Sequence, residues 1–323
     1  INMNSSIKLF LLGMATIILL WVTHGNISQN ALIKNNSIST SQLPTATKLV
    51  RHPFGESIIP VKPKRIIVLN DISLLDPVLS LGIKPIGTVT YYREYDFLFR
   101  GVTNDEAAGI EFVGVGNQPS LEKILMLKPD LILMREYQRS FYKQMAAIAP
   151  TVVIDLPSLN YSFKENLRYI AQLLDVSEKA EEVITKYNER IKQLQQQMGE
   201  RLKDIEVSVI HLYTPNLIGT FAGQETYNQV FKDIGLRLIK VLATQKEQTL
   251  PSSIEELHKF DADVLFVISS SKELKQSFFK NPLLSNLKVA KNNQIYSVLD
   301  NRWWTYGFLG VNKLLDDLFK YLG

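Results

Sequence analysis

Short β-branched runs alternate with helical segments along most of this chain, and this alternation constrains the fold more than any other feature. We predict strands at residues 65–69, 85–89, 112–115, 130–134 and 151–154, with helices at 71–81, 121–127 and 140–148. Runs such as Ile66, Ile67 and Val68 are typical of strands buried on both faces, which is the environment of a parallel sheet. The pattern therefore predicts an α/β fold with parallel strands covered by helices.

The alternation is interrupted once, in the middle of the chain. Residues 163–174 and 178–203 are predicted to be helical with no strand between them, and the second segment is rich in Glu, Lys and Gln. About 24 helical residues span roughly 36 Å, more than one face of a lobe requires. Strands at 207–212, 264–268 and 294–298 and helices at 227–234 and 309–321 follow. We expect two Rossmann-like lobes joined by this single long helix; the alternative is an ordinary surface helix on one domain.

The N-terminal region has the composition of an export signal followed by a tether. Lys8 precedes an apolar run of 14 residues, 9–22, which is shorter than the roughly 20 residues of a membrane-spanning helix. A buried core helix is the alternative for this run. Residues 26–50 are rich in Ser, Asn and Thr, as flexible tethers are. We expect a signal or anchor at 1–25, a tether at 26–50, a first lobe at 51–176, a bridging helix at 177–203 and a second lobe at 204–323.

A short internal repeat indicates that the two lobes are alike. Residues 120–133 align without a gap with residues 253–266. The alternative is a chance match, since helix–turn–strand units recur in many folds. Each copy has a capping Ser, a Glu in the first helical turn (Glu122, Glu255) and an Asp before a buried strand. Two like α/β lobes leave a cleft between them, and ligands of open α/β sheets bind at the carboxyl ends of the strands. The two Glu residues serve either the helix macrodipole, at about 0.3–1 kcal/mol each, or a surface that docks onto a partner.

Composition excludes several kinds of chemistry. The chain has 323 residues, no Cys and only four His, none of them paired at i, i+4. This argues against a disulfide scaffold, an iron–sulfur cluster, a thiol nucleophile and a His-rich metal site. No phosphate-binding loop or nucleophile elbow is present. The net charge of +4 is spread along the chain, unlike the clustered charge of nucleic-acid-binding proteins. These features argue against catalytic residues, protein metal ligands and a nucleic-acid partner.

Aromatic, basic and small polar residues follow the predicted strands. Aromatic rings supply contact area and guanidinium groups bind carboxylate or hydroxamate oxygens, which suits a bulky, partly apolar, anionic ligand. The alternative for each residue is packing at a hinge or rim. The candidate ligand-binding residues are Asn70, Tyr91, Tyr92, Arg93, Arg135, Tyr137, Tyr213, Asn216, Ser270, Arg302, Trp303 and Trp304.

Several segments together resemble the periplasmic substrate-binding proteins of iron–siderophore and cobalamin ABC importers, in particular the ferric-citrate and ferric-siderophore branch. They are residues 65–69, 79–87, 120–132, 148–152, 261–266 and 314–318, and the resemblance covers roughly residues 50–323. It implies a non-enzymatic protein that delivers a ferric chelate to a membrane permease. It also implies that Glu122 and Glu255, which match the family's docking glutamates, pair with permease arginines. Fe(III) would be held by the siderophore, with no intrinsic cofactor.

Two departures from the family pattern bear on the ligand and on localisation. Relatives often carry Arg just after the first strand of the second lobe, where this chain has residues 214–221 without Arg, so Arg302 is a candidate substitute. Many relatives are lipoproteins, whereas this chain has no Cys to modify. We expect a monomeric, exported, periplasmic protein, either freed by cleavage or anchored by its N-terminal segment. Cobalamin or haem binding, a chelatase-like enzyme and an extracellular sensor on the same fold are the alternatives.

Overall fold

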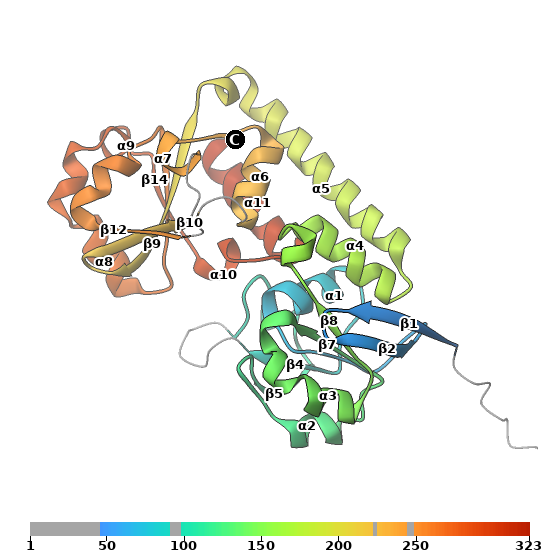
Figure 1. Ribbon diagram of the computed structural model, residues 1–323. Helices are drawn as coiled ribbons and strands as arrows, with labels where there is room; N and C mark the ends of the chain where they lie inside the picture. The colour runs from blue at the N-terminus through green and yellow to red at the C-terminus, as the bar shows by residue number, and fades with distance from the viewer. Residues whose placement is uncertain (1–45, 91–97, 222–224, 244–248) are drawn as a thin grey trace, which may run out of the picture. The chain divides into compact units, whose positions relative to one another are not determined.

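A computed structural model describes residues 46–90, 98–221, 225–243 and 249–323 (Figure 1). This part of the chain contains two six-stranded sheets and a separate two-stranded hairpin. We call each six-stranded sheet with its covering helices a lobe. The predicted export signal at 1–25 and most of the predicted tether lie outside the described residues.

The first sheet has the strand order β6-β5-β4-β3-β7-β8 and is parallel except for β6. Ile66 lies opposite Leu131 and Val68 opposite Leu133, so the predicted apolar runs form the buried centre of the sheet. Its strands are β3 (Ile66–Val68), β4 (Gly87–Thr90), β5 (Glu111–Val115), β6 (Gln118–Pro119), β7 (Leu131–Arg135) and β8 (Thr151–Ile154). Its helical segments are η1 (Asp71–Leu75), α1 (Asp76–Ser80), α2 (Leu121–Met126), η2 (Glu136–Phe141), α3 (Tyr142–Ile148) and η3 (Pro157–Leu159).

The second sheet is mixed, with parallel and antiparallel pairs. The order is β12-β10-β9-β13-β14, and β11 also pairs with β9. A tight turn at Pro215 and Asn216 reverses the chain, so β10 runs antiparallel to β9. Strand β12 pairs antiparallel with β10. The strands are β9 (Glu206–Thr214), β10 (Leu217–Phe221), β11 (Arg237–Leu238), β12 (Thr249–Ser253), β13 (Val264–Ile268) and β14 (Ile295–Val298). The helical segments are α6 (Thr226–Ile234), α7 (Lys240–Ala243), η5 (Ile254–Phe260), α8 (Lys272–Phe279), η6 (Pro282–Asn286), α9 (Lys288–Lys291), α10 (Asp300–Trp303) and α11 (Phe308–Leu322).

Helices α4 (Phe163–Leu173) and α5 (Ser177–Met198) lie between the two sheets in the sequence (Figure 1). Helix α5 is shorter than predicted because the chain turns at Gly199 (φ +56°) and continues as the 3-10 segment η4 (Gly199–Lys203). On α5, Tyr187 donates to Asp233 of α6 at 2.6 Å, and Arg190 pairs with Asp316 of α11 at 2.5 Å. The long helix is thus bonded to two helices of the second lobe.

The hairpin of β1 (Thr47–His52) and β2 (Gly55–Pro60) begins inside the predicted tether. Residues 47–50 are therefore a strand, and the tether boundary at residue 50 is wrong. The alternation of exposed and half-buried side chains along β1 is that of a strand with one face covered. Ser57 donates to the carbonyl of Thr151, which ties the hairpin to β8.

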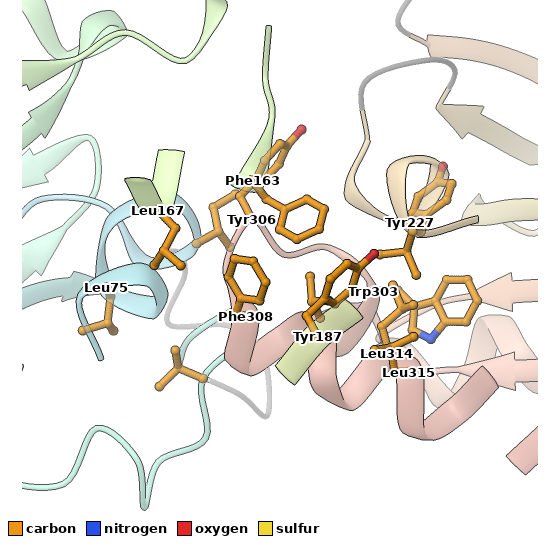
Figure 2. Close-up of a cluster of buried hydrophobic side chains, with 14 of the residues drawn as sticks. Leu75, Phe163, Leu167, Tyr187, Tyr227, Trp303, Tyr306, Phe308, Leu314 and Leu315 are labelled. Atoms are coloured by element: carbon orange, nitrogen blue, oxygen red, sulfur yellow. The ribbon is translucent and has the colours of Figure 1, made fainter. Parts of the chain in front are cut away.

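One apolar cluster includes side chains from both lobes (Figure 2). Phe163, Tyr187 and Phe308 form a three-ring contact with centroids 5.1–5.6 Å apart. The same cluster holds Leu75 from the first lobe and Phe266 from the second. No helix in the described ranges is long and apolar enough to cross a membrane.

Candidate ligand-binding site

Asn70 and Tyr137 meet where β3 and β7 end. The Asn70 side chain caps η1 by accepting from the Ser73 amide at 2.8 Å, which fixes its orientation. Its Nδ2 donates to the Tyr137 hydroxyl at 2.9 Å. Because β3 and β7 are parallel neighbours, their carboxyl ends lie at the same edge of the sheet. The fold thus brings together two predicted site residues that are far apart in the sequence.

Arg135, the last residue of β7, is buried and already paired. Its Nε and Nη2 donate to the Glu136 carboxylate at 2.8 and 2.9 Å, and its Nη1 donates to Ser73 at 2.7 Å. The guanidinium also lies 5.5 Å from the ring centroid of Tyr137. The positive charge of Arg135 is therefore largely balanced within the protein.

A second buried arginine, Arg100, lies in the same region and was not among the predicted residues. Its Nε and Nη2 donate to the Asp71 carboxylate at 2.9 and 2.6 Å, and both side chains are almost fully buried. The Arg100 guanidinium lies 4.7 Å from the ring centroid of Trp304, a cation–π contact. Arg100 thus connects the first lobe to the segment that follows α10.

The second lobe contributes acids and tyrosines. Burial raises the pKa of Glu225 to about 7, although a hydrogen bond with Tyr306 and the charge of Arg100 oppose the shift. Burial likewise raises the pKa of Asp300 to about 6, again against the charge of Arg100. Burial also raises the pKa of the half-exposed Tyr213, with smaller contributions from Asp300 and Glu225. The charge of Arg100 therefore acts on both acids, and both acids act on Tyr213.

These side chains form a group that we call the arginine–tyrosine cluster, in which both lobes take part. Arg100 acts on the pKa of Tyr137 in the first lobe and on that of Glu225 and Asp300 in the second. Arg135 acts on Tyr306 across the same space. The members are Asn70, Asp71, Arg100, Arg135, Tyr137, Tyr213, Glu225, Asp300, Trp304 and Tyr306.

Trp303, which the sequence also predicts as a ligand-binding residue, does not belong to the cluster. Its side chain is fully buried and its Nε1 donates to Asp317 at 3.0 Å. The ring packs on Phe266 at 4.7 Å and on Phe231 at 6.0 Å between centroids. Trp303 is a core residue, while its neighbour Trp304 faces Arg100.

Arg302 is paired on the same carboxylate. Its Nη1 donates to Asp317 at 3.2 Å, with 40% of the Arg302 side chain exposed. The charge of Arg302 is therefore partly balanced, which weakens the idea that it replaces the arginines missing from the second lobe.

The remaining predicted residues are placed as follows. Asn216 is exposed in the β9–β10 turn, and its carbonyl accepts from the Ile254 amide at the start of η5. Ser270 is exposed in a turn between β13 and α8. The structure does not bring either side chain to the cluster. Tyr91, Tyr92 and Arg93 lie outside the described residues.

Sequence reasoning missed Arg100 and Glu225. Arg100 lies ten residues beyond β4, too far from the strand end for the strand-end pattern to include it. Glu225 directly precedes α6. An acid at a helix N-terminus is favoured by the helix dipole, so its position does not by itself indicate a ligand site. The available signal for Arg100 was a single basic residue inside the otherwise apolar stretch 97–102.

Glu122 and Glu255 occupy equivalent positions in the two lobes. Each is exposed in the first turn of a helical segment that follows a Ser, α2 for Glu122 and η5 for Glu255. Neither carboxylate makes an ion pair with the described residues. Exposed apolar side chains accompany Glu122 on α2: Leu121, Leu125 and Met126.

Comparison with known proteins identifies the family. Residues 102–301 match the family described as "Periplasmic binding protein". The chain belongs to this family. It is 33% identical over 310 residues to the "Probable siderophore-binding lipoprotein YfiY" of Bacillus subtilis (strain 168), covering 89% of this chain and 90% of that protein. It is 29% identical to the "Fe(3+)-citrate-binding protein YfmC" of the same organism, covering 84% of each.

A solved structure confirms the fold class. Staphylococcus aureus SirA complexed with staphyloferrin B matches with a TM-score of 0.71 and 27% identity, covering 85% of this chain and 98% of that one. The family is that of extracytoplasmic, non-enzymatic substrate-binding proteins of ABC importers for ferric siderophores and ferric citrate. In the described part of the chain no group of three or more His, Cys, Asp or Glu is arranged to hold a metal ion.

Proposed function

We propose that this protein captures a ferric siderophore or ferric citrate at the arginine–tyrosine cluster and delivers it to a membrane permease. The similarity to a siderophore-binding protein over 89% of the chain carries the proposal. The cluster offers the chemistry that a chelate needs. Tyr137, Tyr213 and Trp304 supply ring surface, and guanidinium donors lie beside two of these rings, Arg135 beside Tyr137 and Arg100 beside Trp304.

The guanidinium groups of the cluster act as donors more than as net charges. A guanidinium carries five N–H groups, and Arg135 uses three of them on Glu136 and Ser73. The other two make no hydrogen bond with the described residues, and we propose that they donate to hydroxamate or carboxylate oxygens of a chelate. Because the chelator holds Fe(III), the protein needs no metal ligands of its own.

Tryptophan fluorescence tests the proposal directly. Trp304 is half-buried beside Arg100, whereas Trp303 is enclosed in the core. Titration with ferric hydroxamate–citrate chelates and ferric citrate should quench the fluorescence in a saturable way. Trp304→Phe should remove most of the quenching, while Trp303→Phe, its matched control, should retain it.

The same titration separates the alternatives. If cobalamin or haem saturates the protein and no ferric chelate does, the proposed ligand is cobalamin or haem rather than a ferric chelate. No saturable response to any of these ligands would contradict the proposal and favour a sensor that keeps the fold without transport.

We further propose that Glu122 and Glu255 dock the protein, as a monomer, onto arginines of the permease. Their equivalent, exposed positions on the two lobes fit a partner that contacts both lobes at once. Leu121, Leu125 and Met126, which are 42%, 60% and 74% exposed, extend the α2 side of this surface with apolar area.

Uptake of a labelled ferric chelate into cells tests the docking. Glu122→Arg combined with Glu255→Arg should abolish uptake and leave ligand affinity intact. Glu182→Arg combined with Glu200→Arg is the control, since these acids are also exposed but lie on α5 and η4. Normal uptake by the first pair, or equal loss in both, would rule out docking through Glu122 and Glu255.

A further inference from the structure

We infer that Asp76, a residue of the first lobe, is a positioning residue for the second lobe's side of the ligand site. The inference rests on the proposed function, because it concerns the segment that carries Asp300, Trp304 and Tyr306. None of these contacts with Asp76 was predicted from the sequence.

Asp76 caps helix α11 from 233 residues away. Its side chain is fully buried, and its carboxylate accepts from the amides of Leu309 at 2.9 Å and Gly310 at 2.8 Å. These amides lie in the first turn of α11, whose own N-cap is Gly307 and has no side chain to satisfy them. Asp76 therefore supplies a cap that the helix cannot provide for itself.

Further bonds hold the same segment to the first lobe. The Thr305 hydroxyl donates to Asp76 at 3.3 Å, and the Gly101 amide donates to the Asn301 carbonyl at 2.6 Å. Lys313 of α11 donates to the Gly101 carbonyl at 2.9 Å and pairs with Glu106 at 2.8 Å. Residues 301–313 are thus bonded to first-lobe residues at both ends and in the middle.

Three glycines around Asp76 allow the backbone to approach Asp76 and Thr305 too closely for any side chain. A Cβ on Gly307 would lie 2.2 Å from the Asp76 carboxyl carbon, and one on Gly310 would lie 2.1 Å from Thr305 Oγ1. A Cβ on Gly101 (φ +79°) would lie 2.6 Å from the same hydroxyl. The three backbones approach this closely only because they have no side chains.

These bonds also fix part of the arginine–tyrosine cluster. Asp300, Trp304 and Tyr306 lie on or beside the segment that these bonds fix. Arg100, stacked on Trp304, directly precedes Gly101 in the chain. The two sides of the cluster are therefore held in register before a ligand arrives, and a site formed in advance binds without paying the entropy of ordering.

The test compares Asp76→Ala with Asp261→Ala. Asp261 is a matched control because its carboxylate also accepts two helix-terminal amides, those of Lys288 at 2.8 Å and Val289 at 3.0 Å, but at α9. We expect Asp76→Ala to weaken ferric-chelate binding about tenfold or more, equivalent to ~1.4 kcal/mol, and Asp261→Ala to leave it within twofold. In the ligand-free protein, amide hydrogen exchange should rise across residues 299–312 in the first variant only.

Milder variants keep the test decisive if Asp76→Ala does not fold. Asp76→Asn retains one acceptor oxygen and Thr305→Val removes only the hydroxyl, so each should give a smaller change of the same kind. Unchanged affinity and unchanged exchange in these variants would overturn the inference. If the wild-type protein binds no ferric chelate, the proposed function fails, and exchange in the ligand-free protein still decides the role of Asp76.

Discussion

Glu225 is a buried acid, and burial disfavours the ionised form of its carboxyl group. Burial raises its pKa to about 7, from 4.5 in the unfolded chain, and its hydrogen bond with Tyr306 does not offset the burial. Between these two values the native state binds more protons than the unfolded state. The free energy of unfolding therefore falls as the pH rises from about 4.5 to 7, and Glu225 destabilises the native protein most above pH 7.

Replacing Glu225 with Gln should remove this pH dependence. Relative to the wild type, Glu225→Gln should gain stability on going from about pH 4.5 to pH 8, by on the order of 3 kcal/mol. Urea unfolding at the two pH values measures the gain, with the exposed Glu200→Gln as the control. An equal difference between variant and wild type at both pH values would contradict the prediction.

Trp303 and Trp304 are neighbours in sequence with opposite roles. Trp303→Phe should lower the free energy of unfolding by about 1–3 kcal/mol, because it loses buried area and the bond to Asp317. Its ligand affinity should stay within about twofold. Trp304→Phe should show the reverse, with little change in stability and weaker binding. Thermal unfolding and ligand titration of both variants check this. Weaker ligand binding by Trp303→Phe alone would contradict the placement of Trp304, rather than Trp303, in the ligand site.

The strand-end pattern predicted part of the cluster at the residue level. Asn70, Arg135, Tyr137, Tyr213 and Trp304 follow strands and lie in the cluster. The pattern could not separate Trp303 from Trp304, because which of two adjacent rings turns inward depends on what packs against them. It also could not show that each arginine has a carboxylate partner, since the pairing of Arg100 with Asp71 joins residues 29 positions apart.

Among the elements, the sequence predicted the apolar parallel strands better than the antiparallel strands β6, β10 and β12. Runs such as 264–268 are apolar throughout and became β13. Strands β10 and β12 lack such runs and contain Gly219 and Pro251. Their pairing depends on the turn at Pro215 and Asn216 and on long-range contact, which periodicity does not reveal. The sequence shows a glycine at position 199, but it does not predict that the α-helix α5 ends there and continues as the 3-10 segment η4.

Helix α5 is fixed to α6 by a network that can be tested as a unit. Tyr187 and Lys164 both bond the Asp233 carboxylate, at 2.6 and 2.7 Å. Tyr187→Phe should cost about 1 kcal/mol, and Asp233→Ala more, about 1–3 kcal/mol, because it leaves the Tyr187 hydroxyl without its acceptor. Chemical denaturation of the single and double variants gives the coupling energy. Strictly additive losses would show that the bond contributes nothing.

The two lobes share one apolar cluster, so we expect them to fold and unfold as one unit. Side chains of both lobes belong to a single apolar cluster, and Trp303 and Phe308 lie in it together with Leu75 and Leu133. We expect one calorimetric unfolding transition for the ligand-free protein, shifted upward by the ligand. Two transitions would show that the lobes unfold independently. The sequence predicted two lobes and a long helix, but the residues that join them come from segments too far apart for any local pattern.

We propose that this protein recognises a ferric chelate as a complete complex. Isothermal titration of the wild-type protein with the ferric and the iron-free forms of the same hydroxamate–citrate siderophore tests it most directly. We predict saturable binding of the ferric form with one site per chain and markedly weaker binding of the iron-free form. Binding of neither form, with saturation by cobalamin or haem instead, would contradict the account.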